Sequence, residues 1–229
     1  MKKIWKLFLL IIIALIVGIL IYLNTGQYGP SNEAILLSDE YAITKVNDNY
    51  QSTNSSSKVG LIMYTGAKVD PLAYSYLART NANLYIVNSP FNMPVFSTKE
   101  AQEIMDSNPT IENWYIMGHS LGGVVAFMYE NNPKVSGVIS LASYPSSDES
   151  TQLMGTNILA IFANEDGLVD KEKYDTLPIG TNKVLIPGNH AGFGDYGIQK
   201  GDNKSSISIN EQHDQIIKEI EEFIQEDSR

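Results

Sequence analysis

Hydrophobic and polar positions divide the chain into a long apolar run and a following domain of shorter runs. The uncharged apolar run covers residues 7–23 and follows a basic tip over 1–6. Beyond it, alternation over 40–46 predicts an antiparallel edge strand, and a serine-rich segment over 51–57 predicts a turn.

Continuous apolar runs and helical patterns then alternate to the end of the chain. Buried parallel strands are typically continuous apolar runs, and such runs lie over 59–64, 83–88, 112–118, 135–141, 157–163 and 183–187. Helices are expected over 71–81, 98–107, 120–131 and 209–226. This alternation predicts an α/β fold with a doubly wound, mostly parallel sheet.

The run over 7–23 predicts a transmembrane signal anchor that is retained. At about 1.5 Å per residue it spans most of a hydrocarbon core of roughly 30 Å. Trp5 and Tyr22 flank it, as amphipathic rings do at a membrane interface. A cleaved signal peptide is the alternative, but it would have a shorter apolar region and small residues at its cleavage site. The positive-inside rule then leaves the tip over 1–6 in the cytoplasm and the domain outside a cell membrane, after a single pass.

Residues 118–122 carry the sequence Gly-His-Ser-Leu-Gly between a predicted strand and a predicted helix. G-x-S-x-G at such a junction is typical of a nucleophile elbow, in which a strained backbone exposes the serine above the sheet. Here the serine is Ser120. The flanking glycines leave room for strand and helix to approach, and the helix N-terminus directs its amides at an anion beside the serine. His119 is expected to pack beneath Ser120.

Two polar residues follow Ser120 in the order acid, then histidine, that an elbow serine requires. Asp166 comes directly after a predicted strand, although Glu165 and Asp170 nearby are alternatives. His190 lies in a loop at the carboxyl end of the last predicted strand, where ligand sites of open α/β sheets gather. The three residues therefore form a candidate catalytic triad.

From about residue 58 to its end, the chain resembles α/β-hydrolases of the compact, lidless kind, similar to the dienelactone-hydrolase-like and small esterase groups. The matching pieces are residues 118–123, 164–169 and 188–194. Dienelactone hydrolases proper use a cysteine nucleophile, and this chain has no cysteine. The resemblance therefore implies a serine esterase reaction, carried by a catalytic domain over 31–229 that a linker over 24–30 joins to the anchor.

The triad template gives each residue a role. Ser120 attacks an acyl carbon, His190 takes the serine proton and returns it to the leaving group, and Asp166 holds the imidazole in the right tautomer. The alternatives are a turn serine, a structural loop histidine and an ordinary Asp-Gly turn.

The oxyanion hole of such an enzyme needs two backbone amides. One is expected to be the N–H of Leu121, the residue after the nucleophile. The other is expected from the loop after the strand over 59–64, where Ala67 is the first choice and Gly66 the next. A simple strand-to-helix turn is the alternative for that loop.

Charge and composition limit the partners of the domain. The chain has a formal net charge of −10, and its basic tip belongs to the anchor, so the domain is more acidic still. This argues against nucleic acid. The chain lacks cysteine, and its three histidines have no metal-ligand spacing, so we expect no metal and no cofactor. His213, in the last predicted helix, is expected to pack or to make a hydrogen bond at the helix end.

The sequence thus predicts a membrane-anchored serine hydrolase that cleaves an ester through an acyl-enzyme. The segments between strands are short and leave no lid, so an open site and a small-molecule or polymer-borne ester are expected. An acyltransferase with the same triad is one alternative. A non-catalytic hydrolase fold that serves as a binding or scaffold protein is the other, since fold does not fix function.

Overall fold

The computed structural model describes residues 2–146 and 157–227, so Met1 of the basic tip and the last residues of the expected domain lie outside the described part. Its strands are β1 (Thr44–Val46), β2 (Asn49–Ser52), β3 (Val59–Tyr64), β4 (Asn83–Ile86), β5 (Asn113–His119), β6 (Val135–Leu141), β7 (Asn157–Ala163) and β8 (Asn182–Ile186). Its α-helices are α1 (Lys2–Asn24), α2 (Asn32–Glu40), α3 (Glu100–Ser107), α4 (Leu121–Phe127) and α5 (Ile209–Asp227). Short 3₁₀ helices are η1 (Pro71–Arg79), η2 (Pro90–Asn92), η3 (Pro94–Phe96), η4 (Lys171–Thr176) and η5 (Ala191–Phe193).

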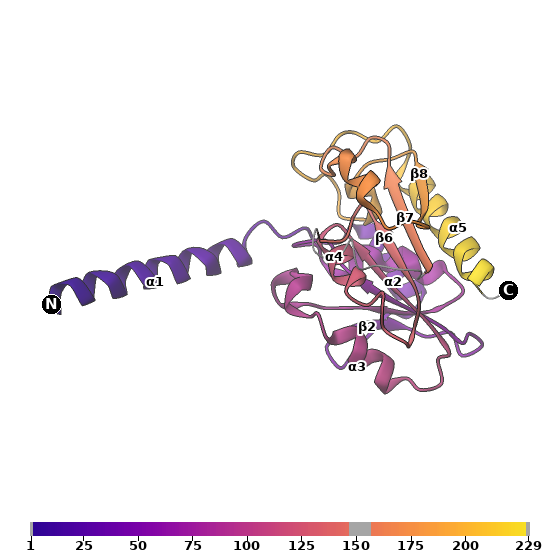
Figure 1. The fold of residues 1–229 in the computed structure, drawn as a ribbon, viewed down its shortest axis with the longest axis horizontal. Helices are drawn as coiled ribbons and strands as arrows, with labels where there is room; N and C mark the ends of the chain where they lie inside the picture. Colours follow the sequence, from indigo (N-terminus) through magenta and orange to yellow (C-terminus); the bar gives the residue numbers. More distant parts are fainter. Residues whose placement is uncertain (1, 147–156, 228–229) are drawn as a thin grey trace.

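The described strands form one eight-stranded sheet in the order β1-β2-β4-β3-β5-β6-β7-β8 (Figure 1). Neighbours from β4 through β8 pair in parallel, whereas β1 and β2 add an antiparallel edge. Apolar side chains of η1 and α5 pack on one face, and those of α3 and α4 pack on the other. The expected doubly wound, mostly parallel sheet is confirmed.

The N-terminal edge differs from the sequence expectation. Residues 32–40 form a helix, capped by Ser31, whose hydroxyl accepts a hydrogen bond from the Ala34 N–H. The edge strand expected over 40–46 is therefore shortened to Thr44–Val46. The turn expected over 51–57 is also wrong at its start, because residues 49–52 pair with β1 and β4.

A tight turn explains the unexpected pairing of β1 with β2. Asn47 and Asp48 both have positive φ angles, of 47° and 68°. Asparagine and aspartate tolerate that conformation, which two-residue hairpins require at both central positions. The Asn-Asp pair was thus the sequence signal for this hairpin.

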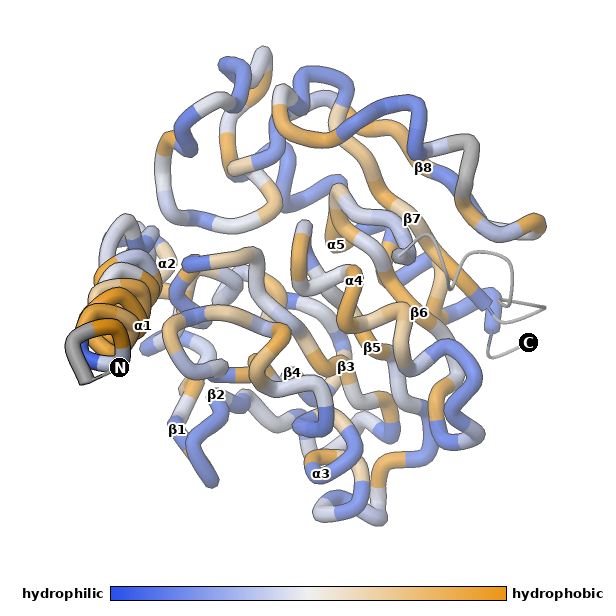
Figure 2. The backbone as a smooth tube through the Cα atoms, turned by 60° about the vertical axis from the view of Figure 1, so that its left-hand side comes forward, coloured by the Kyte–Doolittle hydropathy of each residue, from blue (hydrophilic) through white to orange (hydrophobic). Residues whose placement is uncertain are grey.

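Helix α1 stands apart from the sheet domain. Residues Ile4–Asn24 form the one described helix long and apolar enough to cross a membrane, with a mean hydropathy of 3.0 and no buried residue. Figure 2 shows its hydrophobic residues as a continuous orange segment outside the domain. Within the domain, by contrast, most apolar residues of the central strands β3 to β7 are buried.

Helix α5 packs its apolar stripe onto the sheet and places His213 in the core. The His213 ring lies parallel to the Tyr76 ring, with centroids 3.6 Å apart and an interplanar angle of 4°. Burial, together with the charge of Arg79, lowers the pKa of His213 to about 3. His213 is therefore neutral in the folded protein and packs as an aromatic ring, as expected.

This burial predicts an acid-sensitive fold. Because the pKa of His213 falls from 6.5 in the unfolded chain to about 3 in the folded one, the unfolded state binds more protons between these pH values. The free energy of unfolding should therefore fall as the pH is lowered through that window. In His213→Phe, which keeps a stacked ring but cannot titrate, the thermal midpoint of the full chain in mild detergent should depend less on pH.

Wild type and His213→Phe are to be compared at each pH in the same detergent, by near-ultraviolet circular dichroism. Above the window both should show flat profiles, which separates packing effects from titration. If the thermal midpoints of the two proteins fell equally as the pH was lowered through the window, His213 would not be the group responsible for the acid sensitivity.

Candidate active site

The elbow is formed by a single residue between a strand and a helix. Ser120 follows the end of β5 and precedes α4, and its φ and ψ angles are 51° and −120°. A positive φ costs a non-glycine residue about 1–3 kcal/mol. The Ser120 N–H donates to the carbonyl of Leu141 in β6 at 2.9 Å, which holds the turn against the sheet.

Both glycines of the motif are required by close backbone contacts. A Cβ atom on Gly118 would lie 2.1 Å from the carbonyl oxygen of Gly122. A Cβ atom on Gly122 would lie 2.2 Å from the carbonyl oxygen of Tyr64 in β3. Only residues without a side chain let α4 begin this close to the carboxyl ends of β3 and β5.

The loops after β7 and β8 bring Asp166 and His190 together. Asp166 Oδ2 lies 2.8 Å from His190 Nδ1, and both side chains are buried. Asp166 Oδ1 accepts hydrogen bonds from the N–H groups of Leu168 and Val169, at 2.8 and 2.9 Å. Burial raises the pKa of Asp166, but the His190 hydrogen bond and charge and the two amides outweigh it, so the net pKa lies below its usual range.

An ionised Asp166 fixes the tautomer of the imidazole. A carboxylate can only accept, so His190 Nδ1 carries the proton and Nε2 is left as a base. The two alternative acids are occupied elsewhere. Glu165 accepts from the N–H groups of Gly188 and Ser206, and Asp170 accepts from the Glu172 N–H at the start of η4.

Ser120 and His190 line the same cavity of about 390 Å³. No hydrogen bond joins Ser120 Oγ to His190 in this structure, although both residues are described. Their neighbours in the cavity wall are chiefly apolar: Leu121, Val124, Ala142, Ser143, Tyr144, Leu168, Val169 and Gln199. Among the described residues, no group of three or more histidine, aspartate or glutamate side chains could hold a metal ion. The cavity suits an apolar acyl group next to a hydroxyl and an imidazole.

The two candidate oxyanion amides differ in their availability. Leu121 is the first residue of α4, so its N–H has no acceptor within the helix. The Gly66 N–H donates to Tyr74 Oη at 2.8 Å and is already paired. The Ala67 N–H has no hydrogen-bond partner among the described residues. This difference favours Ala67 over Gly66 as the second donor.

Tyr74 and His119 form a buried, hydrogen-bonded pair next to His190. Tyr74 Oη also lies 2.8 Å from His119 Nδ1, and the His119 ring centroid lies 4.6 Å from that of His190. Burial, with the charge of His190, holds the pKa of His119 well below its usual range, so the ring is neutral. His119 thus packs against the base. Sequence reasoning missed Tyr74, which lies within an expected helix and carries no motif.

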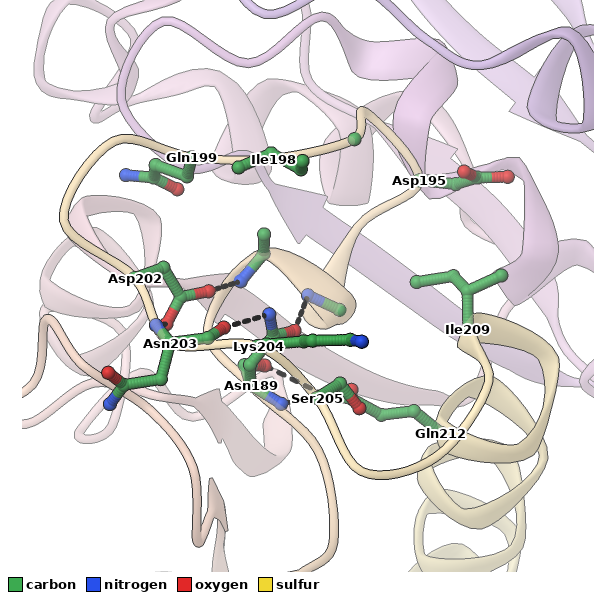
Figure 3. A pocket seen from close by; sticks show the side chains of 13 residues that line it. Asn189, Asp195, Ile198, Gln199, Asp202, Asn203, Lys204, Ser205, Ile209 and Gln212 are labelled. Atoms are coloured by element: carbon green, nitrogen blue, oxygen red, sulfur yellow. Dashed lines mark hydrogen bonds between the residues drawn. The ribbon is translucent and has the colours of Figure 1, made fainter.

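Asp202 connects the loops that carry Asp166 and His190. Its Oδ2 accepts from the Ala191 N–H at 2.8 Å, and its Oδ1 accepts from the Gly167 N–H at 3.0 Å. These amides belong to the residues directly after His190 and Asp166. Asp202 lines a second cavity, of about 610 Å³, which neither Ser120 nor His190 lines (Figure 3). Sequence reasoning missed Asp202 because it lies in a polar, glycine-containing loop.

Removing the Asp202 carboxylate should loosen the geometry of the site. In Asp202→Ala both amides lose their acceptor, and a displacement of about 1 Å at a reacting group can cost about a hundredfold in rate. We expect two rates to fall by about ten- to a hundredfold: the rate at which a fluorophosphonate probe labels Ser120, and kcat on an ester substrate.

Asp170→Ala is the matched control, because it removes a carboxylate that caps η4 without contacting the His190 loop. Its labelling rate should stay close to that of the wild type. Equal rates for the Asp202 and Asp170 variants, at equal folded fraction, would argue against a positioning role.

Comparison with known proteins identifies the family. A model described as the alpha/beta hydrolase family matches residues 60–214, whereas no curated protein matches the chain. The chain is similar in structure to the Pyrococcus furiosus esterase Pf2001, with a TM-score of 0.61, 9% identity, and coverage of 82% of this chain and 92% of that chain. It is also similar to Est1E from Butyrivibrio proteoclasticus, with a TM-score of 0.55, 11% identity, and coverage of 81% and 97%. At these identities the solved structures show the shared fold, and the family match extends over more than half of the sequence. The chain therefore belongs to the alpha/beta hydrolase family and is a hydrolase of that fold.

Proposed function

We propose that this hydrolase cleaves a carboxylic ester through a serine acyl-enzyme and is anchored in a membrane by α1. The observation that carries the proposal is the arrangement of three groups around one cavity. Ser120 lies on the strained turn, and His190, hydrogen-bonded to a buried Asp166, lines the same cavity. The esterase named among the similar structures supports the same class of reaction.

The chemistry follows from the position of each group. Ser120 Oγ attacks the acyl carbon while His190 Nε2 accepts its proton, and the charge of Asp166 stabilises the imidazolium. The N–H groups of Leu121 and Ala67 donate to the oxygen that becomes negative. His190 then protonates the leaving alcohol and activates a water that releases the acid from Ser120.

The anchor proposal rests on α1 and on the chain that follows it. The helical segment Ile4–Asn24 is long enough to span, with Lys2 and Lys3 before it and Lys6 in its first turn. We propose a single pass with the basic tip in the cytoplasm and the catalytic domain on the outer side of a cell membrane. A cleaved leader would remove α1, so the intact mass of the mature chain from membranes distinguishes the two forms.

Covalent labelling tests the nucleophile directly. The full chain in membranes should react with a fluorophosphonate probe, and peptide mass spectrometry should locate the adduct on Ser120. Ser120→Ala should abolish the adduct. Asp166→Asn keeps the shape but leaves the imidazole in the wrong tautomer, so kcat on an ester should fall by about four powers of ten.

Heat-denatured chain serves as the control for nonspecific reaction with the probe. An unlabelled chain with the circular dichroism of a folded α/β protein would overturn the proposal. That outcome would favour the non-catalytic scaffold alternative.

A further inference from the structure

We propose that the mouth of the catalytic cavity rests on the bilayer that α1 spans, so that the substrate is the ester of an amphiphile held at the membrane surface. This inference rests on the proposed esterase activity and membrane anchor. The expected substrate is then an ester that enters the cavity from the lipid interface, and not a freely soluble ester.

The chain between anchor and domain is too short to lift the domain away. α1 ends at Asn24, and Tyr28 is already bound to the domain. The Tyr28 N–H donates to the Lys68 carbonyl at 2.8 Å, and the Tyr28 carbonyl accepts from the Asp70 N–H at 2.9 Å. At about 3.5 Å per residue the link between Asn24 and Tyr28 reaches at most ~14 Å. The polar layer on each side of a bilayer is about 5–8 Å thick, so the docked segment lies at the membrane surface.

Lys68 joins the end of α1 to the loop with the candidate oxyanion amide. Its Nζ donates to the carbonyls of Tyr22 and Thr25, at 2.8 and 3.1 Å, and lies 3.6 Å from the centre of the Tyr22 ring. A cation at the C-terminus of a helix satisfies its free carbonyls and its dipole. Lys68 directly follows Ala67, so the end of the membrane helix is fixed one residue from the proposed oxyanion donor.

An apolar ridge lies beside this link. The ridge consists of Phe91, Val95 and Phe96, which are 39%, 42% and 54% exposed. The Phe91 carbonyl accepts from Gln27 Nε2 of the linker at 3.3 Å, and η3, which contains Val95 and Phe96, packs against α4 of the elbow. Exposed aromatic side chains next to a membrane anchor gain free energy by entering the interface.

The ridge, the linker and the oxyanion loop form one hydrogen-bonded unit. Asn92 Nδ2 donates to Gln27 Oε1 at 3.0 Å, and the Asn92 carbonyl accepts from the Lys68 N–H at 2.7 Å. Phe91 and Asn92 both keep positive φ angles, of 58° and 51°, which non-glycine residues rarely adopt. The loop therefore holds an unfavourable backbone while it exposes Phe91 next to the anchor.

Two further exposed apolar side chains lie at or next to the catalytic cavity. Leu168 lines the catalytic cavity and is 39% exposed, and Ile198, next to the cavity residue Gln199, is 94% exposed. In Figure 1, α1 leaves one side of the domain, and the C-terminal end of α5 lies on the opposite side. The bilayer that α1 spans therefore lies on the side of the domain from which α1 leaves, and the contacts of Gln27 with Phe91 and Asn92 place the ridge next to that helix. The apolar cavity wall would accept the acyl chain of a lipid-like ester.

Spin labelling tests the membrane contact without requiring activity. Because the chain has no cysteine, Phe96→Cys and Ile179→Cys each provide a unique nitroxide site in the full chain. Ile179 is the matched control, fully exposed before β8. In nanodiscs of phosphatidylcholine and phosphatidylglycerol, the ratio of oxygen to nickel-chelate collision rates should be severalfold higher at position 96 than at 179.

Equal ratios at the two positions, in a chain incorporated in the nanodiscs, would overturn the membrane contact. A chain that fails to co-float with lipid vesicles would refute the anchor itself, and the inference with it. The flotation result therefore distinguishes a missing contact between position 96 and the bilayer from a missing membrane anchor.

Hydrolysis of two esters with one fluorogenic alcohol tests the substrate class. One is a water-soluble butyrate, and the other is a palmitate partitioned into the nanodisc. In Phe96→Asp the ratio of palmitate to butyrate hydrolysis should fall by about tenfold, because a carboxylate resists entry into the interface. In Ile179→Asp the ratio should stay at the wild-type value.

An unchanged ratio in Phe96→Asp, or a wild type that cleaves only the butyrate, would overturn the inference while leaving the esterase proposal intact. A wild type that cleaves neither ester would refute the esterase proposal. The nitroxide result would then still decide whether the mouth touches the bilayer.

Discussion

The backbone conformation of Ser120 is the constraint on which the rest of the site depends. Its positive φ persists because β5 and α4 are held in backbone contact at Gly118 and Gly122, and both elements are buried in the same apolar layer. The packing of strand and helix thus offsets a local cost of about 1–3 kcal/mol. The same geometry fixes the first amide of α4 next to Ser120, so the proposed nucleophile and the proposed oxyanion donor share one rigid support.

Asp166 and His190, the proposed acid and base, depend on a different kind of support. Their loops are held mainly by carboxylates that accept backbone N–H groups: Asp202 binds the amides after Asp166 and His190, and Glu165 binds the Gly188 amide before His190. Hydrogen bonds to a charged acceptor are about twice as strong as neutral ones. These hydrogen bonds act together with the burial of Ala191 and Phe193 in the apolar core to fix the position of the His190 loop.

The sequence predicted what depends on local pattern. Continuous apolar runs marked the parallel strands, and the elbow motif with the order Asp166, then His190 placed the candidate residues at strand ends. It did not predict the helix over 32–40 or the hairpin at Asn47, whose apolar patterns are weak. Nor could it find Tyr74 or Asp202, because each acts on residues distant in the chain and only the folded arrangement makes them neighbours.

The contacts of the linker restrict how the domain can rotate relative to α1. A free glycine-containing linker would let the domain rotate on the membrane, but Tyr28 forms a bridge with Val69 and its ring lies 5.4 Å from that of Tyr196. The linker therefore contacts both the loop of Ala67 and the chain that follows His190. If the proposed membrane contact holds, the mouth of the cavity meets lipid-held esters at a high effective concentration, as any tethered partner does. The restricted rotation of the domain would then favour esters at the membrane over esters in solution.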